Sequence, residues 1–471
     1  MKIGYIHIVT LAFFTLISPD PALMVITGIV LFIVLRLMWR ENEPKHLLVN
    51  MVLYWLVIGI LLPYGSIFQK PLIELSRYGG TDKVPEATFL GAIALLLIVL
   101  GIHLPIRNLI VSSKEILLSI LERYDGQRLF TGYIAYSFFA ALITPVLLRV
   151  SGGQMLMSLV YFKWSFLTFL IIHTLVIPSN TKYVLLFIIF EILLSFSGFW
   201  AEFKDYVLVA IGAFFTLSRK VSFKEAFYTT LVGVVIFFVS TVWSFSKGEY
   251  RNYLTGGERS QAVVQTDQIQ NISRLFEIIQ KDFSGENFAN SFSVGSDNLV
   301  YRISYVEFLA LTLKNVPTFI PHEDGQLFIG ALEHIFKPRI FFPDKKVIYD
   351  SEITSQYTGV QFAGKDQGTS FSLGNVAEAY VDFGYVYMFI PIFFYGLLLG
   401  YMYRTLLLKG YNLVWGLCYS APILQFAWSF PVPATKYLGW SITWFVGFFL
   451  INRYLIKYLD EWLLRKEFRE R

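Results

Sequence analysis

The sequence predicts an all-α, polytopic integral membrane protein with about twelve transmembrane helices and one large helical loop outside the cytoplasm. Hydrophobic side chains make up 55% of its 471 residues, and charged side chains only 15%. The mean hydropathy of +0.56 is typical of membrane proteins with several spans. Apolar runs near the ~20 residues that cross a ~30 Å hydrocarbon layer recur along the chain. Residues 246–383 interrupt them with a long polar stretch.

The apolar runs divide the chain into three parts. Residues 1–245 hold expected spans 1 to 9, residues 246–383 form the loop, and residues 384–471 hold expected spans 10 to 12 and a basic amphipathic tail. No small-residue cleavage site follows the first run, so we expect a retained helix there and not a signal peptide. The runs lie near residues 4–18, 21–38, 47–65, 87–106, 129–148, 154–177, 182–199, 205–218, 226–245, 384–407, 411–429 and 436–455.

Basic residues near the ends of the runs predict the orientation, because Lys and Arg of short loops stay on the cytoplasmic side. They gather after the second, fourth and eighth runs and in the tail. This pattern places both termini in the cytoplasm and residues 246–383 outside it. It also accounts for the net charge of +5, so we infer membrane lipids and no nucleic acid as partners. Residues 114–124 and 453–471 are amphipathic, which is typical of helices that lie on a membrane surface.

Two charged residues lie inside expected spans. Lys163 is about nine residues into the sixth span and Glu191 about nine into the seventh, so both lie near mid-depth at about 1.5 Å per residue. A functional pair and a structural ion pair are both open, and we favour the structural ion pair. At the outer end of the seventh span, Lys204 is either a solvated charge beside aromatic membrane anchors or a cationic ligand.

The long loop is expected to be helical. Apolar residues at helical spacing predict helices near residues 269–279, over residues 301–309 and over residues 326–336. No strand-like alternation is sustained there, so we expect helices that lie on the membrane core. The single cysteine, Cys418, excludes a disulfide within the chain. No acidic cluster has convincing metal-ligand spacing, so we expect no metal site.

The polar end of the loop, residues 337–384, is suited to chemistry. Prolines on either side of Arg339 prevent a helix from continuing, so Arg339 is presented from a constrained, partly extended backbone. A guanidinium offers a planar fork to phosphate, and Lys345 adds a point charge. The alternative is that Arg339 pairs with Asp344 while the neighbouring phenylalanines anchor at the membrane interface.

A helix is expected to follow, capped by residues 369–372 and running past Gly384 into the tenth span. It places Glu378 and Asp382 four residues apart on one face. Such a pair can act as a general base and its orienting partner, with one pKa raised by the other carboxylate. Acids at this spacing are also common on solvated helix ends, so both interpretations stay open.

Taken together, these features resemble the O-antigen polymerase class, the Wzy-type oligosaccharide repeat-unit polymerases of bacterial envelopes. The resemblance depends on the spans, on a dominant late loop, and on two motifs. The motifs read PRIFFPDK over residues 338–345 and AEAYVDFG over residues 377–384. There are two departures. Relatives often carry an Arg near the outer end of a middle span, where this chain has Lys204, and Ala377 replaces a glycine expected before Glu378.

The resemblance implies a multi-pass protein of the bacterial cytoplasmic (inner) membrane that polymerises undecaprenyl-pyrophosphate-linked oligosaccharide repeat units into a surface polysaccharide or exopolysaccharide. Lipid-linked units are then both donor and acceptor, a flippase and a chain-length regulator are suggested partners, and no cofactor is needed. An acceptor hydroxyl attacks the anomeric carbon of the donor, and lipid pyrophosphate leaves. Because fixed cations can stabilise the leaving group, we expect a metal-independent glycosyltransferase.

Under this interpretation, cations bind the departing pyrophosphate and a carboxylate, Glu378 ahead of Asp382, takes the proton. Two other functions stay open. One is ligase-like transfer to another acceptor, and the other is a lipid-linked oligosaccharide flippase, although the chain has no visible inverted repeat. The expected catalytic residues are Arg339, Glu378, Asp382 and Lys345, and the expected pyrophosphate- or substrate-binding residues are Lys204, Arg302, Asp344, Tyr380 and Arg251.

Overall fold

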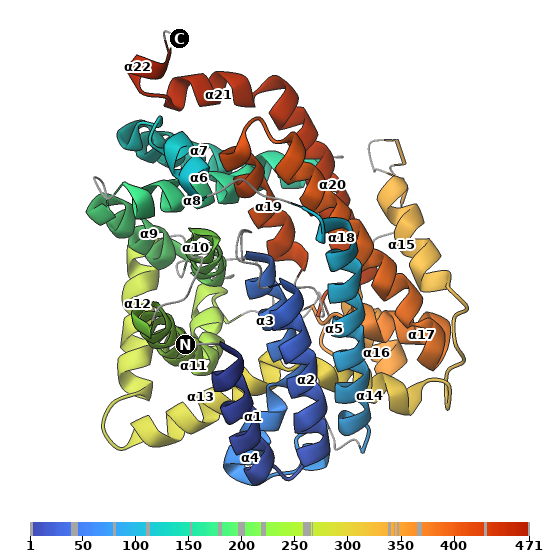
Figure 1. Cartoon of the computed structure of the whole chain (residues 1–471). Coiled ribbons are helices and arrows are strands. Elements are labelled where there is room, and N and C mark those ends of the chain that lie inside the picture. The colour runs from blue at the N-terminus through green and yellow to red at the C-terminus, as the bar shows by residue number, and fades with distance from the viewer. Residues whose placement is uncertain are drawn as a thin grey trace.

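The described part of the computed structural model of the chain consists mainly of helices (Figure 1). Among the residues it describes there is no β-strand, and the bridge between Tyr124 and Leu464 is isolated. The all-α fold class that the sequence predicts is therefore confirmed for this part of the chain. The structure describes residues 3–38, 46–78, 82–109, 114–150, 153–177, 181–195, 203–217, 223–257, 265, 267–337, 341–342, 344–345, 348–364, 370–427 and 431–469.

Each expected apolar run coincides with a helix or with a pair of helices. The run near residues 47–65 is divided between two helices, and the other runs each form one. These helices are α1 (Ile3–Ile17), α2 (Pro21–Met38), α3 (His46–Gly59), α4 (Leu61–Phe68), α5 (Val84–Ile106), α7 (Gly126–Arg149), α8 (Met157–Val176), α9 (Thr181–Ser195), α10 (Phe203–Leu217), α11 (Phe223–Leu254), α18 (Phe389–Lys409), α19 (Leu413–Ala427) and α20 (Ala434–Tyr454).

Five helices within the described ranges are long and apolar enough to cross a membrane, and a bent pair makes a sixth candidate. The five are α2, α5, α7, α8 and α18. The pair is Met51–Gly59 with Leu61–Phe68, bent by 45°. These helices support a membrane protein with several spans. The expected number of about twelve, and the side of the membrane on which the loop lies, stay predictions.

The helices α5 and α18 pack along each other, and glycines allow their backbones to approach closely. A Cβ atom on Gly101 of α5 would lie 2.5 Å from the carbonyl oxygen of Phe393. One on Gly396 of α18 would lie 2.4 Å from the carbonyl oxygen of Ile98. Small residues are typical of helix contacts in membranes, where close van der Waals packing holds the helices together. The two helices are therefore closely packed, and α5 also contacts α14 of the loop.

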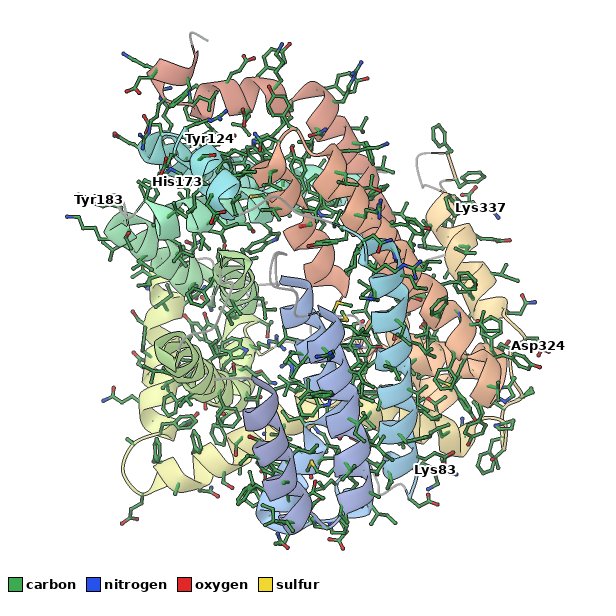
Figure 2. The ribbon with its side chains drawn as sticks, in the orientation of Figure 1. Lys83, Tyr124, His173, Tyr183, Asp324 and Lys337 are labelled. Carbon is green, nitrogen blue, oxygen red and sulfur yellow. The ribbon has the colours of Figure 1, made fainter. Side chains whose placement is uncertain are left out.

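The two amphipathic segments meet at one end of the molecule, where α6 (Lys114–Leu121) lies near α21 (Ile456–Leu463) and α22 (Lys466–Arg469) (Figure 1). Asp460 of α21 accepts hydrogen bonds from the Tyr124 hydroxyl and the Trp415 indole, both at 2.6 Å. His173 Nε2 lies 3.3 Å from the Tyr124 carbonyl oxygen. Figure 2 shows Tyr124 and His173 at the end of the molecule opposite Lys83. The tail is thus fastened to the basic loop before α7.

The loop is helical, as predicted, and α13 and α14 lie at the end opposite α21 (Figure 1). The helices expected near residues 269–279 and over residues 326–336 are confirmed. The helix expected over residues 301–309 is wrong, because the chain breaks at Tyr305, whose N–H donates to the Val57 carbonyl at 3.3 Å. The loop helices are α12 (Gln268–Asp282), α13 (Asn287–Ile303), α14 (Val306–Asn315), α15 (Gln326–Phe336) and α16 (Asp350–Thr358).

The helix that carries the second motif is α17 (Asn375–Tyr387), and it departs from the prediction at both ends. Gly374 precedes it and no side chain caps it, so a cap from the described residues 370–372 is ruled out. Gly384 has φ +68° and ψ −170°, a conformation nearly restricted to glycine. The continuous helix into the tenth span is therefore wrong. The chain turns at Gly384, and α17 packs against α14 and α15.

Candidate functional site

A cavity of about 160 Å³ lies where α15, α16, α17 and the start of α20 meet. Its walls are mainly apolar, and two carboxylic side chains, Glu378 and Asp350, contribute to them. We call it the carboxylate pocket. The lining residues are Gln326, Leu327, Gly330, Ala331, Ile348, Asp350, Ile353, Leu373, Glu378, Pro433 and Thr435.

Glu378, the expected general base, lies in this pocket and is only 9% exposed. One of its oxygens accepts a hydrogen bond of 2.6 Å from the N–H of Ala434, at the start of α20. Burial raises the pKa of Glu378 to about 8. The Ala434 N–H and Lys436 oppose this rise, whereas Asp350 and Asp382 add to it. Glu378 can therefore exchange a proton close to neutral pH.

Asp350 is the second acid of the pocket, and the sequence assigned it no role. It begins α16, is buried, and forms an ion pair with Lys436 of α20. The hydroxyls of Ser372 and Ser370 donate to it at 2.7 and 3.4 Å. Lys436 lies 86 positions away in the chain, so no local spacing could have indicated this pair.

Asp382 and Glu378 are both on α17, but they accept hydrogen bonds from different helices: Asp382 from α15 and Glu378 from α20. Its two oxygens accept hydrogen bonds from the N–H groups of Leu327 at 3.0 Å and Phe328 at 2.7 Å. These groups belong to the first turn of α15, whose N–H donors have no partner within the helix. Burial raises the pKa of Asp382, and these two hydrogen bonds oppose the shift. The geometry makes Asp382 a cap of α15, and its predicted part in catalysis stays a prediction.

Tyr380, which the sequence predicts to bind substrate, lies between Glu378 and Asp382 in the chain. Its side chain is fully buried. Its hydroxyl donates a hydrogen bond of 2.9 Å to the carbonyl oxygen of Val316, just after α14. This contact fastens α17 to α14. The hydroxyl is thus engaged in packing the loop.

Four cations from three separate segments gather near the C-terminal end of α13, and we call them the basic cluster. They are Arg77, which follows the 3₁₀ turn η1 (Leu72–Glu74), Lys247 and Arg251 of α11, and Arg302 of α13. Arg302 and Arg77 are exposed, and Lys247 and Arg251 are half-buried. The structure therefore brings together Arg302 and Arg251, two residues that the sequence predicts to bind substrate, with two further cations.

The cations of the basic cluster repel one another. Burial and then the charges of Arg302, Arg251 and Arg77 lower the pKa of Lys247 to about 7. Burial and Arg302 lower the pKa of Arg251 to about 10. No carboxylate of the described residues lies within ion-pair distance of Arg77, Lys247 or Arg302. Because like charges held together favour a bound anion, the cluster is suited to a group such as a diphosphate.

The backbone at Arg77 is held in place by a buried acid, Glu307 of α14. One Glu307 oxygen accepts hydrogen bonds from the N–H of Arg77 at 2.6 Å and of Tyr78 at 2.8 Å. The Ser76 hydroxyl donates to the same oxygen at 2.6 Å. Glu307 therefore stabilises the turn that presents Arg77. The Glu307 carboxylate accepts hydrogen bonds from the backbone of this turn and not from the Arg77 guanidinium.

The pocket and the basic cluster are joined through Tyr305. Its hydroxyl donates a hydrogen bond of 2.6 Å to the carbonyl oxygen of Ser372, whose own hydroxyl donates to Asp350 at 2.7 Å. On its other side Tyr305 lies close enough to Arg302 for their charges to interact. The two sets of charges are thus neighbours across one aromatic side chain.

The remaining predicted site residues lie apart from these two sets or are not described. Arg339 lies outside the described residues, and Lys204 is in α10 with its side chain outside them. The Lys345 ammonium donates to the carbonyl oxygen of His334 near the end of α15. Asp344 is exposed beside it. The first motif is therefore seen only in part.

The predicted ion pair between Lys163 and Glu191 is present. Lys163 Nζ of α8 lies 2.8 Å from Glu191 Oε1 of α9. Lys163 also donates to the Tyr206 hydroxyl at 2.7 Å, and the Tyr133 hydroxyl donates to Glu191. With its polar atoms paired in this way, the group joins α7, α8, α9 and α10, as a structural ion pair would.

The site combines the buried carboxyl of Glu378 with the crowded cations of the basic cluster. Within the described ranges, no three His, Cys, Asp or Glu side chains come together as a metal site, and metal-independent chemistry stays a prediction. Comparison with known protein families, curated proteins and solved structures finds no match.

Proposed function

We propose that this protein is a membrane glycosyltransferase that polymerises lipid-diphosphate-linked oligosaccharide repeat units outside the cytoplasm. The basic cluster is the observation that carries the proposal. Among the described residues, no carboxylate lies within ion-pair distance of Arg77, Lys247 or Arg302, and the cluster lies across Tyr305 from the buried carboxyl of Asp350. A departing diphosphate supplies the missing negative charge. The motif resemblance supports undecaprenyl pyrophosphate as the lipid carrier.

The proposed reaction joins an acceptor hydroxyl to the anomeric carbon of the donor sugar. The bond from that carbon to the diphosphate oxygen breaks, and the diphosphate leaves with the bonding electron pair. Glu378 in its ionised form takes the proton of the hydroxyl. A carboxyl with a pKa of about 8 is well matched to this task, because a general base works best when its pKa lies near the operating pH.

The cations stabilise charge that develops on the leaving oxygens. Such stabilisation is strongest when the charges are already in place before the reaction. Arg302 and Arg251 keep the substrate-binding role expected from the sequence, and Lys247 and Arg77 join them. Arg339 is proposed as a further phosphate ligand on the strength of its motif.

The cellular setting follows from the basic loops and from the resemblance. We place the protein in the bacterial inner membrane with both termini in the cytoplasm. In this orientation α13 and α14 face the compartment outside the cytoplasm, where a flippase delivers repeat units. The hydrogen bond from Tyr124, in the connection between α6 and α7, to Asp460 of α21 at the opposite end fits this arrangement.

The test is a polymerisation assay with purified protein in a chelating buffer. The substrates are lipid-linked repeat units that accumulate in host cells lacking the gene, and the products are separated by length. We expect a ladder of polymers from the wild type. Arg302→Ala should lower the rate by about 10²-fold or more, the effect typical of removing a charge-stabilising group.

Arg274→Ala is the matched control, because Arg274 is an exposed arginine of the same loop that pairs with Glu277 at 2.8 Å. It should retain the wild-type rate. A wild-type ladder from Arg302→Ala would contradict the proposed role of the basic cluster. Transfer of single units to a lipid core would indicate a ligase, and movement of intact units across vesicles without new bonds would indicate a flippase.

A further inference from the structure

We infer that Asp350 and Lys436 form a positioning pair for Glu378, and that Asp350 rather than Asp382 is the acid that works with it. The catalytic meaning of this inference rests on the proposed function. The pair itself is argued from the geometry of the carboxylate pocket. Neither Asp350 nor Lys436 touches the substrate in this scheme, since both act through Glu378.

The start of α20 holds both acids of the pocket. The Ala434 N–H donates to Glu378, and two residues later Lys436 pairs with Asp350. The side chain of Lys436 is 41% exposed, whereas that of Asp350 is only 5% exposed. One helix end therefore sets the positions of two carboxylates that come from α17 and α16.

Asp350 is also hydrogen-bonded to the segment that leads into α17. The Ser372 hydroxyl donates to it, and the Ser372 carbonyl accepts from Tyr305 beside the basic cluster. A shift of Asp350 would therefore disturb contacts on both sides of the site. Asp382 has no such connection, because its oxygens are engaged by the backbone of α15.

Several charged or titratable groups act on Glu378 from the helices around it. The negative charges of Asp350 and Asp382 favour its protonated form, and the positive charge of Lys436 favours its ionised form. Burial is the largest cause and favours the protonated form. The groups are Asp350 and Tyr357 of α16, Asp382 of α17, and Lys436 and Tyr437 of α20.

Because Asp350 and Lys436 carry opposite charges, removing one or the other should shift the titration of Glu378 in opposite directions. Removing the charge of Asp350 should make Glu378 easier to ionise, both by losing a negative neighbour and by leaving Lys436 unpaired. Removing the charge of Lys436 should make Glu378 harder to ionise. A pair that only fastened α16 to α20 would lower stability in both variants without moving the titration of Glu378 in opposite directions.

The first experiment measures the polymerisation rate against pH. In the wild type the rate should rise with pH as Glu378 ionises. In Asp350→Asn this rise should move to lower pH, and in Lys436→Met to higher pH, each on the order of one pH unit. Lys436→Arg keeps the charge and should restore the wild-type profile. Glu352→Gln, an exposed acid in the same turn of α16, is the matched control and should leave the profile unchanged.

The second experiment does not depend on activity. Infrared spectra of the purified protein are recorded across pH, and the spectrum of Glu378→Gln is subtracted to isolate the Glu378 carboxyl band. Opposite shifts of this titration in Asp350→Asn and Lys436→Met support the pair. Unmoved titrations overturn it, whatever the enzyme does. Opposite shifts in the spectra with an unchanged rate profile would instead remove Glu378 as the base and leave the pair in place.

Discussion

The carboxylate pocket and the basic cluster differ in how their charged groups are paired. In the pocket each acid has a partner within the protein: Glu378 has the Ala434 N–H, and Asp350 has Lys436. In the basic cluster, Lys247 and its neighbours crowd one another. The difference fits the proposal that the pocket controls a proton and the cluster receives a charged ligand.

The largest effect is expected from removing the proton acceptor. Glu378→Gln preserves the size of the side chain and its acceptor for the Ala434 N–H. We expect it to lower the polymerisation rate by about 10²- to 10⁴-fold, the range typical of a general base. Circular dichroism and the melting temperature serve as controls for folding. Wild-type turnover in this variant would show that Glu378 is not the base and that the pocket has only a structural role.

The second effect concerns stability against pH in the pocket. The pKa of Glu378 in the folded protein is about 8, above the ~4.3 of an unperturbed glutamate. Between these values the folded state binds more protons than the unfolded state, so stability falls as pH rises towards 8. Glu378→Gln lacks this loss, which is on the order of 3.5 kcal/mol between pH 5 and pH 8.

The melting temperatures of the two proteins, measured in detergent, test this prediction. The advantage of Glu378→Gln over the wild type should grow from pH 5 to pH 8. An advantage that stays constant across this range would show that Glu378 does not titrate there.

The third and smallest effect concerns the basic cluster. Lys247→Met removes one of four repelling cations, so we expect weaker donor binding, by about tenfold, together with a higher melting temperature of the unliganded protein. The pKa of Lys247 in the folded protein is about 7, below its ordinary value. Stability of the wild type should therefore rise with pH above 7, and the advantage of Lys247→Met should shrink over the same range.

Lys281→Met is the matched control for Lys247, because Lys281 is an exposed lysine of the same loop that pairs with Glu249 at 3.2 Å. It should leave donor binding unchanged. Inorganic pyrophosphate should raise the melting temperature of the wild type more than that of Lys247→Met, since a ligand that binds only the folded state stabilises it. Equal stabilisation of both proteins would contradict an anion site at Lys247.

Local patterns in the sequence predicted the helices at the apolar runs and two helices of the loop. Hydrophobic runs and helical spacing depend on neighbours a few residues apart, so they placed α12 and α15 and the helices at the apolar runs. They failed at Tyr305 and Gly384. At Tyr305 a hydrogen bond to Val57 accompanies the break between two helices, and at Gly384 a backbone angle open to glycine turns the chain.

The candidate site was predictable only in part. The sequence singled out Glu378, Arg251 and Arg302 by residue type and position, but it paired Glu378 with Asp382, its neighbour on the helix. The structure pairs Asp382 with α15 and places Asp350 in the pocket instead. Lys247 and Arg251, four residues apart with like charge, were the one local sign of the cluster.

The sequence by itself determined that this protein is all-helical, rich in membrane-length apolar helices, and polar at the end of one long loop. Only the tertiary structure decided which charges meet: Asp350 with Lys436, and Arg77 with Lys247 and Arg302. The physical reason is range. Helix formation is read from residues within a turn or two, whereas a charge finds its partner through space, once helices distant in the chain have packed together.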